Sequence, residues 1–143
     1  MAISTEVKKA KAVCIAKGET LTPLRQRVLE IVLKQRTPIK AYDILRELQR
    51  DNEKAAPPTA YRALDFLVDM GVIHRLESLS AYVACSHEDM SGGGLFFVCD
   101  KCHAIVEEHD SRIDRMLAKK GAEAGFTVSN HEVEIHGTCR NCS

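Results

Sequence analysis

Hydrophobic residues in the first half of the chain recur every three or four positions, which is the spacing of one face of a helix. The clearest such face follows Thr22-Pro23, a capping hydroxyl and a proline suited to a first helical turn. Three more helices are predicted, between Ser4 and Gly18, over 41–50 and over 58–70. The apolar face after Thr22-Pro23 consists of Leu24, Val28, Ile31 and Val32.

Two short apolar runs follow these helices, at Val72-Ile73 and over 81–83, and they predict a pair of strands joined by a turn. Four helices followed by a hairpin are the pattern of a winged helix-turn-helix domain, whose last helix reads DNA. A polar, glycine-rich stretch over 86–94 predicts a hinge. We therefore expect a winged-helix DNA-binding domain over 1–85.

The remainder of the chain mixes strands with one helix. Strands are predicted over 95–98 and 104–106, a helix from Asp110 or Ser111 to Gly121, and a last strand over 126–135. The whole chain is thus predicted to be α+β, with a second, small α/β domain over 95–143.

The composition permits a folded core but no membrane span. Apolar residues make up 45% of the 143 residues, and the longest runs without Lys, Arg, Asp or Glu, 78–87 and 90–99, are far too short for a bilayer. No apolar stretch follows the early lysines, so we expect no secretory signal and a cytoplasmic protein.

The net charge is zero, but the charges are unevenly divided. Residues 1–40 hold nine Lys and Arg against three acids, whereas residues 91–143 hold six against eight. The first half can therefore present the positive face that binding to phosphates requires. Lysines scattered over the surface would give the same count.

Cysteine spacing is the strongest chemical signal in the chain. Four of the six cysteines form two C-x-x-C pairs, Cys99 with Cys102 and Cys139 with Cys142. Two such pairs supply the tetrahedral four-sulfur set of a structural zinc, and four thiolates leave no open position for catalysis. Buried or redox-active dithiols are the alternative, which two pairs in a cytosolic chain disfavour.

Cys14 falls at a helical core position and is predicted to be a small buried residue.

A second group of metal-binding residue types lies on both sides of the predicted hinge: His74, Cys85, His87 and Glu107. Nitrogen, sulfur and oxygen ligands together suit zinc, and ligands drawn from two domains would make a sensor rather than a structural site. Spacing alone leaves this set open, because a lone cysteine or histidine more often belongs to the core or the surface.

Several stretches of the chain together resemble the zinc uptake regulator (Zur) branch of the ferric uptake regulator (Fur) family. The similarity runs from about residue 6 to residue 142, and its most specific part is the string PPTAYRALDFL over 57–67. The other residues that carry it are Leu21–Pro23, Arg25, Ala41–Asp43, Gly71, His74, Glu77-Ser78, Tyr82-Val83, Cys85, Cys99-Asp100, Cys102 and His136-Gly137.

The resemblance implies a homodimer in which the second domain dimerises, and which represses zinc-uptake genes when zinc is bound. It implies one structural and one regulatory zinc per chain and no enzyme activity. His74, Cys85 and Glu107 match three regulatory ligands of the family by position. The fourth is normally a histidine of the hinge loop, where this chain has Gly92-Gly93-Gly94. We assign His87, the remaining histidine of that loop, as the fourth ligand.

Some members of the family hold a further metal, and Asp114 and His131 match two of its ligands by position. The partners expected around residues 91–95 are absent from this chain. We therefore expect both residues to be polar residues of the surface.

Four residues are candidates for contact with DNA. The predicted helix over 58–70 carries Tyr61 and Arg62 near its N-terminus and off its apolar face. An arginine can donate two hydrogen bonds to guanine, a tyrosine can contact a thymine methyl or a phosphate, and the matching residues of the family contact DNA. Thr59 and Arg25 complete the set. The alternatives are partial core packing for Tyr61, a solvated ion pair with Asp65 for Arg62, and helix capping for Thr59.

Three rival functions stay open on the sequence. A family member that senses iron, manganese or peroxide would have the same fold, but the thiolate of Cys85 favours zinc, since iron and manganese prefer harder ligands. A zinc-dependent hydrolase would need an open metal position and a positioned base, and the chain has no H-E-x-x-H string. A winged helix used for protein contacts alone would lack salt-dependent DNA binding.

Overall fold

The computed structural model of the chain describes residues 3–35, 37–85 and 94–143. The chain divides into two compact units, Met1–Cys85 and Ser86–Ser143. The hinge predicted over 86–94 lies outside the described residues, except for Gly94. No helix in the described part of the chain is long and apolar enough to cross a bilayer.

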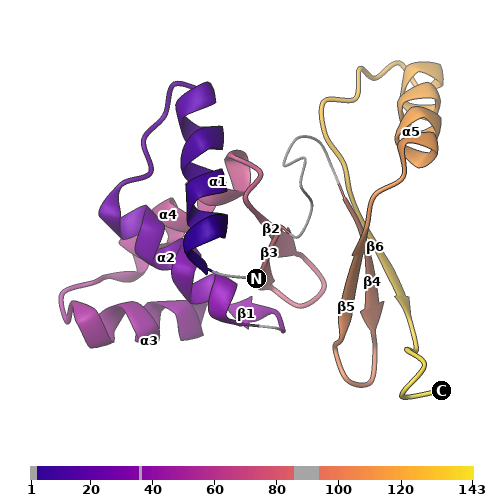
Figure 1. Cartoon of the computed structure of the whole chain (residues 1–143). Helices are drawn as coiled ribbons and strands as arrows, with labels where there is room; N and C mark the ends of the chain where they lie inside the picture. Colours follow the sequence, from indigo (N-terminus) through magenta and orange to yellow (C-terminus); the bar gives the residue numbers. More distant parts are fainter. Residues whose placement is uncertain (1–2, 36, 86–93) are drawn as a thin grey trace. The chain divides into compact units, whose positions relative to one another are not determined.

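Four helices and a small antiparallel sheet make up the first unit (Figure 1). The sheet has the order β1-β3-β2, so the predicted hairpin gains a third, two-residue strand that the sequence pattern did not predict. The four predicted helices and the hairpin are confirmed. The elements in chain order are α1 (Ile3–Ala16), α2 (Pro23–Lys34), β1 (Ile39–Lys40), α3 (Ala41–Asp51), α4 (Pro57–Asp69), β2 (Ile73–Leu76) and β3 (Ala81–Ala84).

Helix α2 is central to this unit and packs against α1, α3, α4 and β3. It begins as predicted, because the hydroxyl of Thr22 accepts a hydrogen bond from the backbone N–H of Arg25 at 3.3 Å. Cys14 of α1 is completely buried in the same core, which confirms its predicted place. The large side chains of this core include Leu29, Ile31, Ile44, Leu64, Leu67 and Ile73.

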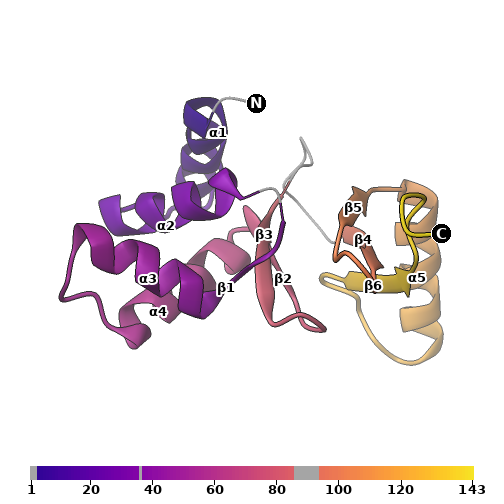
Figure 2. The same ribbon diagram turned by 90° about the horizontal axis from the view of Figure 1, so that it is seen from below.

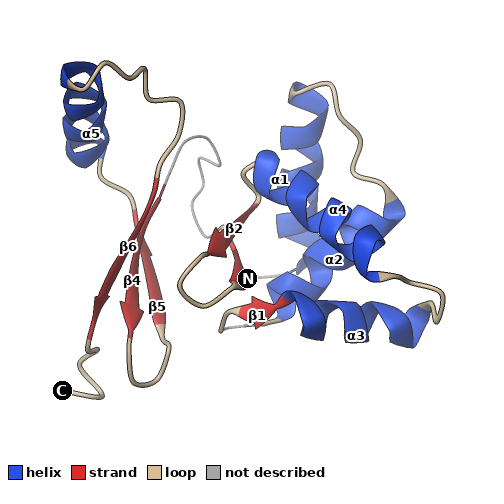
Figure 3. Ribbon diagram, turned by 180° about the vertical axis from the view of Figure 1, so that it is seen from behind, coloured by secondary structure: helices blue, strands red, loops and turns tan. Residues whose placement is uncertain are grey.

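The second unit is a three-stranded sheet with one helix (Figure 3). Its central strand is antiparallel to one neighbour and parallel to the other, in the order β5-β4-β6 (Figure 2). A parallel pair needs a long crossover, and the helix with its loops supplies it. The elements are β4 (Gly94–Cys99), β5 (Ile105–Glu108), α5 (Ser111–Glu123) and β6 (Glu132–Gly137).

The strand predicted over 126–135 is wrong in its first half, since β6 begins only at Glu132. The backbone N–H of Phe126 donates to the carbonyl of Gly121 at 2.8 Å, so the chain turns back over the end of α5. A Cβ on Gly121 would lie 2.5 Å from Cγ2 of Val128, so only glycine leaves room for this packing. Val128 thus packs against α5 instead of extending the sheet, whereas the side chain of Phe126 is exposed. Helix α5 runs past Gly121, its predicted end.

Candidate functional site

The four cysteines of the two C-x-x-C pairs come together at one end of the sheet in the second unit. Cys99 is the last residue of β4 and lies opposite Gly137, the last residue of the parallel strand β6. Cys102 lies in the turn between β4 and β5, and Cys139 and Cys142 follow β6. Because β4 and β6 are parallel neighbours, both strands deliver their pairs to the same end, and the four sulfurs lie within 4.8 Å of one another.

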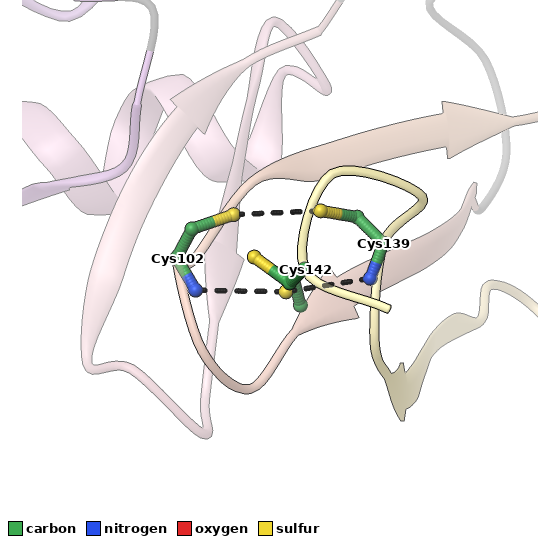
Figure 4. Close-up of side chains that lie close together, drawn as sticks. Cys102, Cys139 and Cys142 are labelled. Carbon is green, nitrogen blue, oxygen red and sulfur yellow. Dashed lines mark hydrogen bonds between the residues drawn. The ribbon is translucent and has the colours of Figure 1, made fainter.

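The distances in this quartet are those of a metal site. Around a tetrahedral zinc with Zn–S bonds of about 2.3 Å, neighbouring sulfurs lie about 3.8 Å apart. The sulfurs of Cys102 and Cys139 are 3.7 Å apart. Figure 4 shows these two side chains pointing toward each other, with Cys142 between them. Four sulfur ligands complete the usual coordination of zinc, so the quartet has no position for a substrate.

The thiols of the quartet also differ in acidity. The backbone N–H groups of Cys102 and Cys139 point at the sulfur of Cys99, at 3.5 and 3.4 Å, and lower its pKa to about 6. Hydrogen bonds with the thiols of Cys139 and Cys102 raise the pKa of Cys142 to about 12. Four thiolates this close repel one another unless a cation lies between them. A divalent zinc would hold all four as thiolates, so the donor set fits that ion.

Two contacts that the sequence did not predict brace the quartet. The backbone N–H of Asp100 donates to the carbonyl of Gly137 at 2.9 Å, and Nδ1 of His136 lies 3.4 Å from a carboxylate oxygen of Asp100. They join the turn of the first cysteine pair to the strand that leads to the second. The sequence pointed to Asp100, His136 and Gly137 only through the family resemblance and their nearness to the cysteines, and it predicted no contact between them.

His74 and Cys85 form a buried pair at the hairpin of the first unit. His74 lies in β2 opposite Val83, and the backbone N–H of Cys85 donates to the carbonyl of Val72 at 3.0 Å, just beyond β3. A ring nitrogen of His74 and the sulfur of Cys85 lie within 4.8 Å of each other, and each residue is only 5% exposed. A buried imidazole beside a thiol is a donor pair that suits zinc.

The other two predicted ligands of this site come from the part of the sequence that follows the first unit. Glu107 belongs to the second unit, where it is half-buried in β5 opposite Phe96. His87 lies outside the described residues. Their part in a metal site therefore stays a prediction.

Asp114 and His131, which the sequence analysis expects to be polar residues of the surface, are half-buried and lie in contact. Nε2 of His131 lies 3.1 Å from one oxygen of Asp114, and Nε2 of His109 lies 3.4 Å from the other. The side chain of His131 is only 16% exposed. The carboxylate of Asp114 therefore joins α5 to the segment before β6 through His131, and to the segment after β5 through His109. The sequence pattern did not single out His109.

Tyr61 and Arg62 lie exposed on the first half of α4, with half of Tyr61 accessible. The other half is buried, so partial core packing stays an alternative to a contact with DNA for Tyr61. Thr59 is half-buried and is not the cap of α4, since that position belongs to Ala56. The predicted alternative of helix capping by Thr59 is thus wrong.

Arg25 lies in the first turn of α2, and its side chain makes contacts within the protein. Its Nη1 donates to the carbonyl of Thr20 at 2.8 Å, and the centre of its guanidinium lies 3.6 Å from the centre of the Phe66 ring. This contact joins α2 to α4.

Comparison with known proteins gives one family. Residues 16–136 match the ferric uptake regulator family. The zinc uptake regulation protein of Escherichia coli is 36% identical over 135 residues, which cover 94% of this chain and 79% of that protein. The peroxide operon regulator of Bacillus subtilis is 26% identical over 138 residues, 96% of this chain and 94% of that protein.

Solved structures of zinc uptake regulators are also similar to this chain. A zinc uptake regulator in complex with zinc and DNA matches with a TM-score of 0.89 and 33% identity, over 99% of this chain and 95% of that one. The holo form of the regulator XcZur matches with a TM-score of 0.85 and 38% identity, over 98% of this chain and 97% of that one.

Proposed function

Because this chain belongs to the ferric uptake regulator family, we propose that it is a zinc-responsive transcriptional repressor and not an enzyme. It binds operator DNA as a zinc-loaded homodimer in the cytoplasm and shuts off zinc-uptake genes. The observation that carries this proposal is the buried pair of His74 and Cys85, a nitrogen and a sulfur donor held side by side outside the four-cysteine quartet. Its relatives include a regulator solved with both zinc and DNA.

The two metal sites take different roles in this proposal. Zinc at the quartet of the second unit is structural, because four thiolates close its coordination sphere. Zinc at the second site is regulatory: His74 and Cys85 supply the first two ligands, and His87 and Glu107 supply the others. These four ligands come from the predicted DNA-binding domain (1–85), the hinge (86–94) and the dimerisation domain (95–143). Zinc would therefore restrict motion between the domains and lower the entropy cost of binding two half-sites.

Thr59, Tyr61 and Arg62 of α4 are the proposed contacts to the operator. The N-terminal part of a reading helix is the part that meets base edges in the major groove. Arg62 is exposed there and can donate two hydrogen bonds to a guanine. Arg25, the fourth predicted contact, has partners within the protein, because its guanidinium is bonded to Thr20 and stacked on Phe66.

Response to peroxide, iron or manganese is the second candidate function, since peroxide regulators also align with nearly the whole chain. The thiol of Cys85 beside His74 favours zinc over it, because iron and manganese prefer oxygen and nitrogen ligands. Operator binding measured with each metal in turn separates the two functions. Zinc should support binding at the lowest free concentration.

Replacing Arg62 with alanine tests the DNA contact. We expect operator affinity to fall by about 5-fold to 150-fold, because a bidentate arginine–guanine contact discriminates by about 1–3 kcal/mol. Fluorescence anisotropy of a labelled promoter duplex, in zinc and at several salt concentrations, measures the loss. Arg115→Ala removes the same charge from α5 and is the control. Equal affinity of wild type and Arg62→Ala would remove Arg62 from the interface.

A further inference from the structure

The contact between Arg25 and Phe66 connects two helices that have different tasks. Arg25 lies in the first turn of α2, the helix around which the first unit is packed, and Phe66 lies in α4, the reading helix. The guanidinium centre lies 3.6 Å from the ring centre, which is the distance of a planar cation stacked on an aromatic face. The hydrogen bond from Nη1 to the carbonyl of Thr20, at 2.8 Å, fixes the same guanidinium from a second side.

Phe66 lies on the reading helix close to the turn that presents Arg62. It follows Arg62 by four residues, so the two side chains lie on the same side of α4, one turn apart. Long side chains in a helix lean toward its N-terminus, which carries the ring toward the turn that presents Arg62. In its first half α4 buries only the small side chains of Ala60 and Ala63, whereas Leu64 and Leu67 follow later. The packed core therefore holds the N-terminal half of α4 through little apolar surface.

We infer that Arg25 is a positioning residue for DNA recognition, which sets the orientation of α4 through Phe66 and does not bind a phosphate. The inference rests on the proposed function, because it concerns the helix that presents Arg62 to the operator. A positioning role and a phosphate contact differ in their effect on operator binding relative to non-specific DNA binding. Base contacts depend on the orientation of α4, whereas phosphates are bound by charge regardless of sequence. Loss of the stack should therefore weaken operator binding and leave non-specific binding unchanged.

Four variants of the full zinc-loaded protein test this: Arg25→Gln, Arg25→Lys, Phe66→Leu and the double variant Arg25→Gln with Phe66→Leu. Each is titrated by anisotropy against a zinc-uptake promoter duplex and against an unrelated duplex of equal length, at several salt concentrations. Thermal melts establish that each variant is folded. Arg25→Lys is the matched control for charge, because lysine keeps the charge but has no planar group to stack.

We expect each single variant to lose about threefold to tenfold in operator affinity, the range of a partly desolvated cation–ring contact. The double variant should bind no more weakly than the weaker single variant, since both changes remove the same contact. Binding to the unrelated duplex and its salt dependence should stay at the wild-type values.

A phosphate contact would give the opposite pattern. Arg25→Gln would then weaken both duplexes and reduce the salt slope by about 0.9, while Arg25→Lys and Phe66→Leu would bind like wild type. That result would overturn the inference. Backbone amide NMR shifts of residues 59–62 give a readout without DNA. They should move alike in Arg25→Gln and Phe66→Leu, and unchanged shifts would overturn it as well. Failure of the wild type to bind the promoter in zinc would instead refute the proposed function.

Discussion

Cys102→Ser is expected to remove one zinc per chain and to unfold the second unit. The quartet is closed by two turns at the end of a small sheet, and none of the residues of α5, all of which the structure describes, is buried. Structural zinc binds with about 10–16 kcal/mol in small domains, which is comparable to the whole stability of a typical domain, about 5–15 kcal/mol. Zinc content by mass spectrometry, circular dichroism and gel filtration should show the loss of one zinc, of sheet structure and of the dimer.

Cys14→Ala is the control for this experiment, because it removes a thiol from the core of the first unit and leaves the quartet intact. It should keep its zinc. The first unit has its own core, so its helices should persist in Cys102→Ser. A Cys102→Ser protein that retained full zinc content and the wild-type circular dichroism spectrum would show that the quartet is not a structural zinc site.

Cys85→Ser is expected to abolish zinc-dependent DNA binding while the quartet zinc stays in place. The change replaces a sulfur that lies within 4.8 Å of a ring nitrogen of His74 by a hydroxyl, which is a poor ligand for zinc. Loss of a supporting group alone costs a metal site about 10-fold to 100-fold in affinity, so loss of a direct ligand should cost at least that much. Anisotropy at buffered free zinc measures the shift.

By linkage, operator DNA should also tighten zinc binding in the wild type, and this coupling should vanish in Cys85→Ser. Cys14→Ala is again the matched thiol control and should respond to zinc like the wild type. A Cys85→Ser protein that bound the operator as tightly as wild type, with its quartet zinc still present, would contradict the assignment of Cys85 to the regulatory site.

Local signals in the sequence account for most of the helices and for the quartet. Thr22-Pro23 fixes the start of α2 because a capping hydroxyl and a proline act within one turn. The spacing of the two C-x-x-C pairs identifies four thiolates, whatever the fold between them. Both features are properties of a few neighbouring residues, and the structure has both where the sequence predicts them.

Contacts between distant segments explain what the sequence did not reveal. The residues before β6 have a strand-like pattern, and only the space over Gly121 shows that Val128 packs on a helix end. The stack of Arg25 on Phe66 joins two helices that a residue-by-residue pattern treats separately. His109 enters the cluster of Asp114 and His131 only through the fold. Hydrophobic periodicity describes the faces of single elements and carries no information on such pairs.

Zinc content per chain and promoter binding, measured before and after mild chelation, distinguish a regulatory zinc from the structural one. We expect about two zincs to fall to about one, since only the closed quartet should resist the chelator. DNA affinity should collapse in the same step and return when zinc is restored. One zinc throughout, with promoter binding unaffected by the chelator, would mean that the quartet is the structural site and that the regulatory site does not exist.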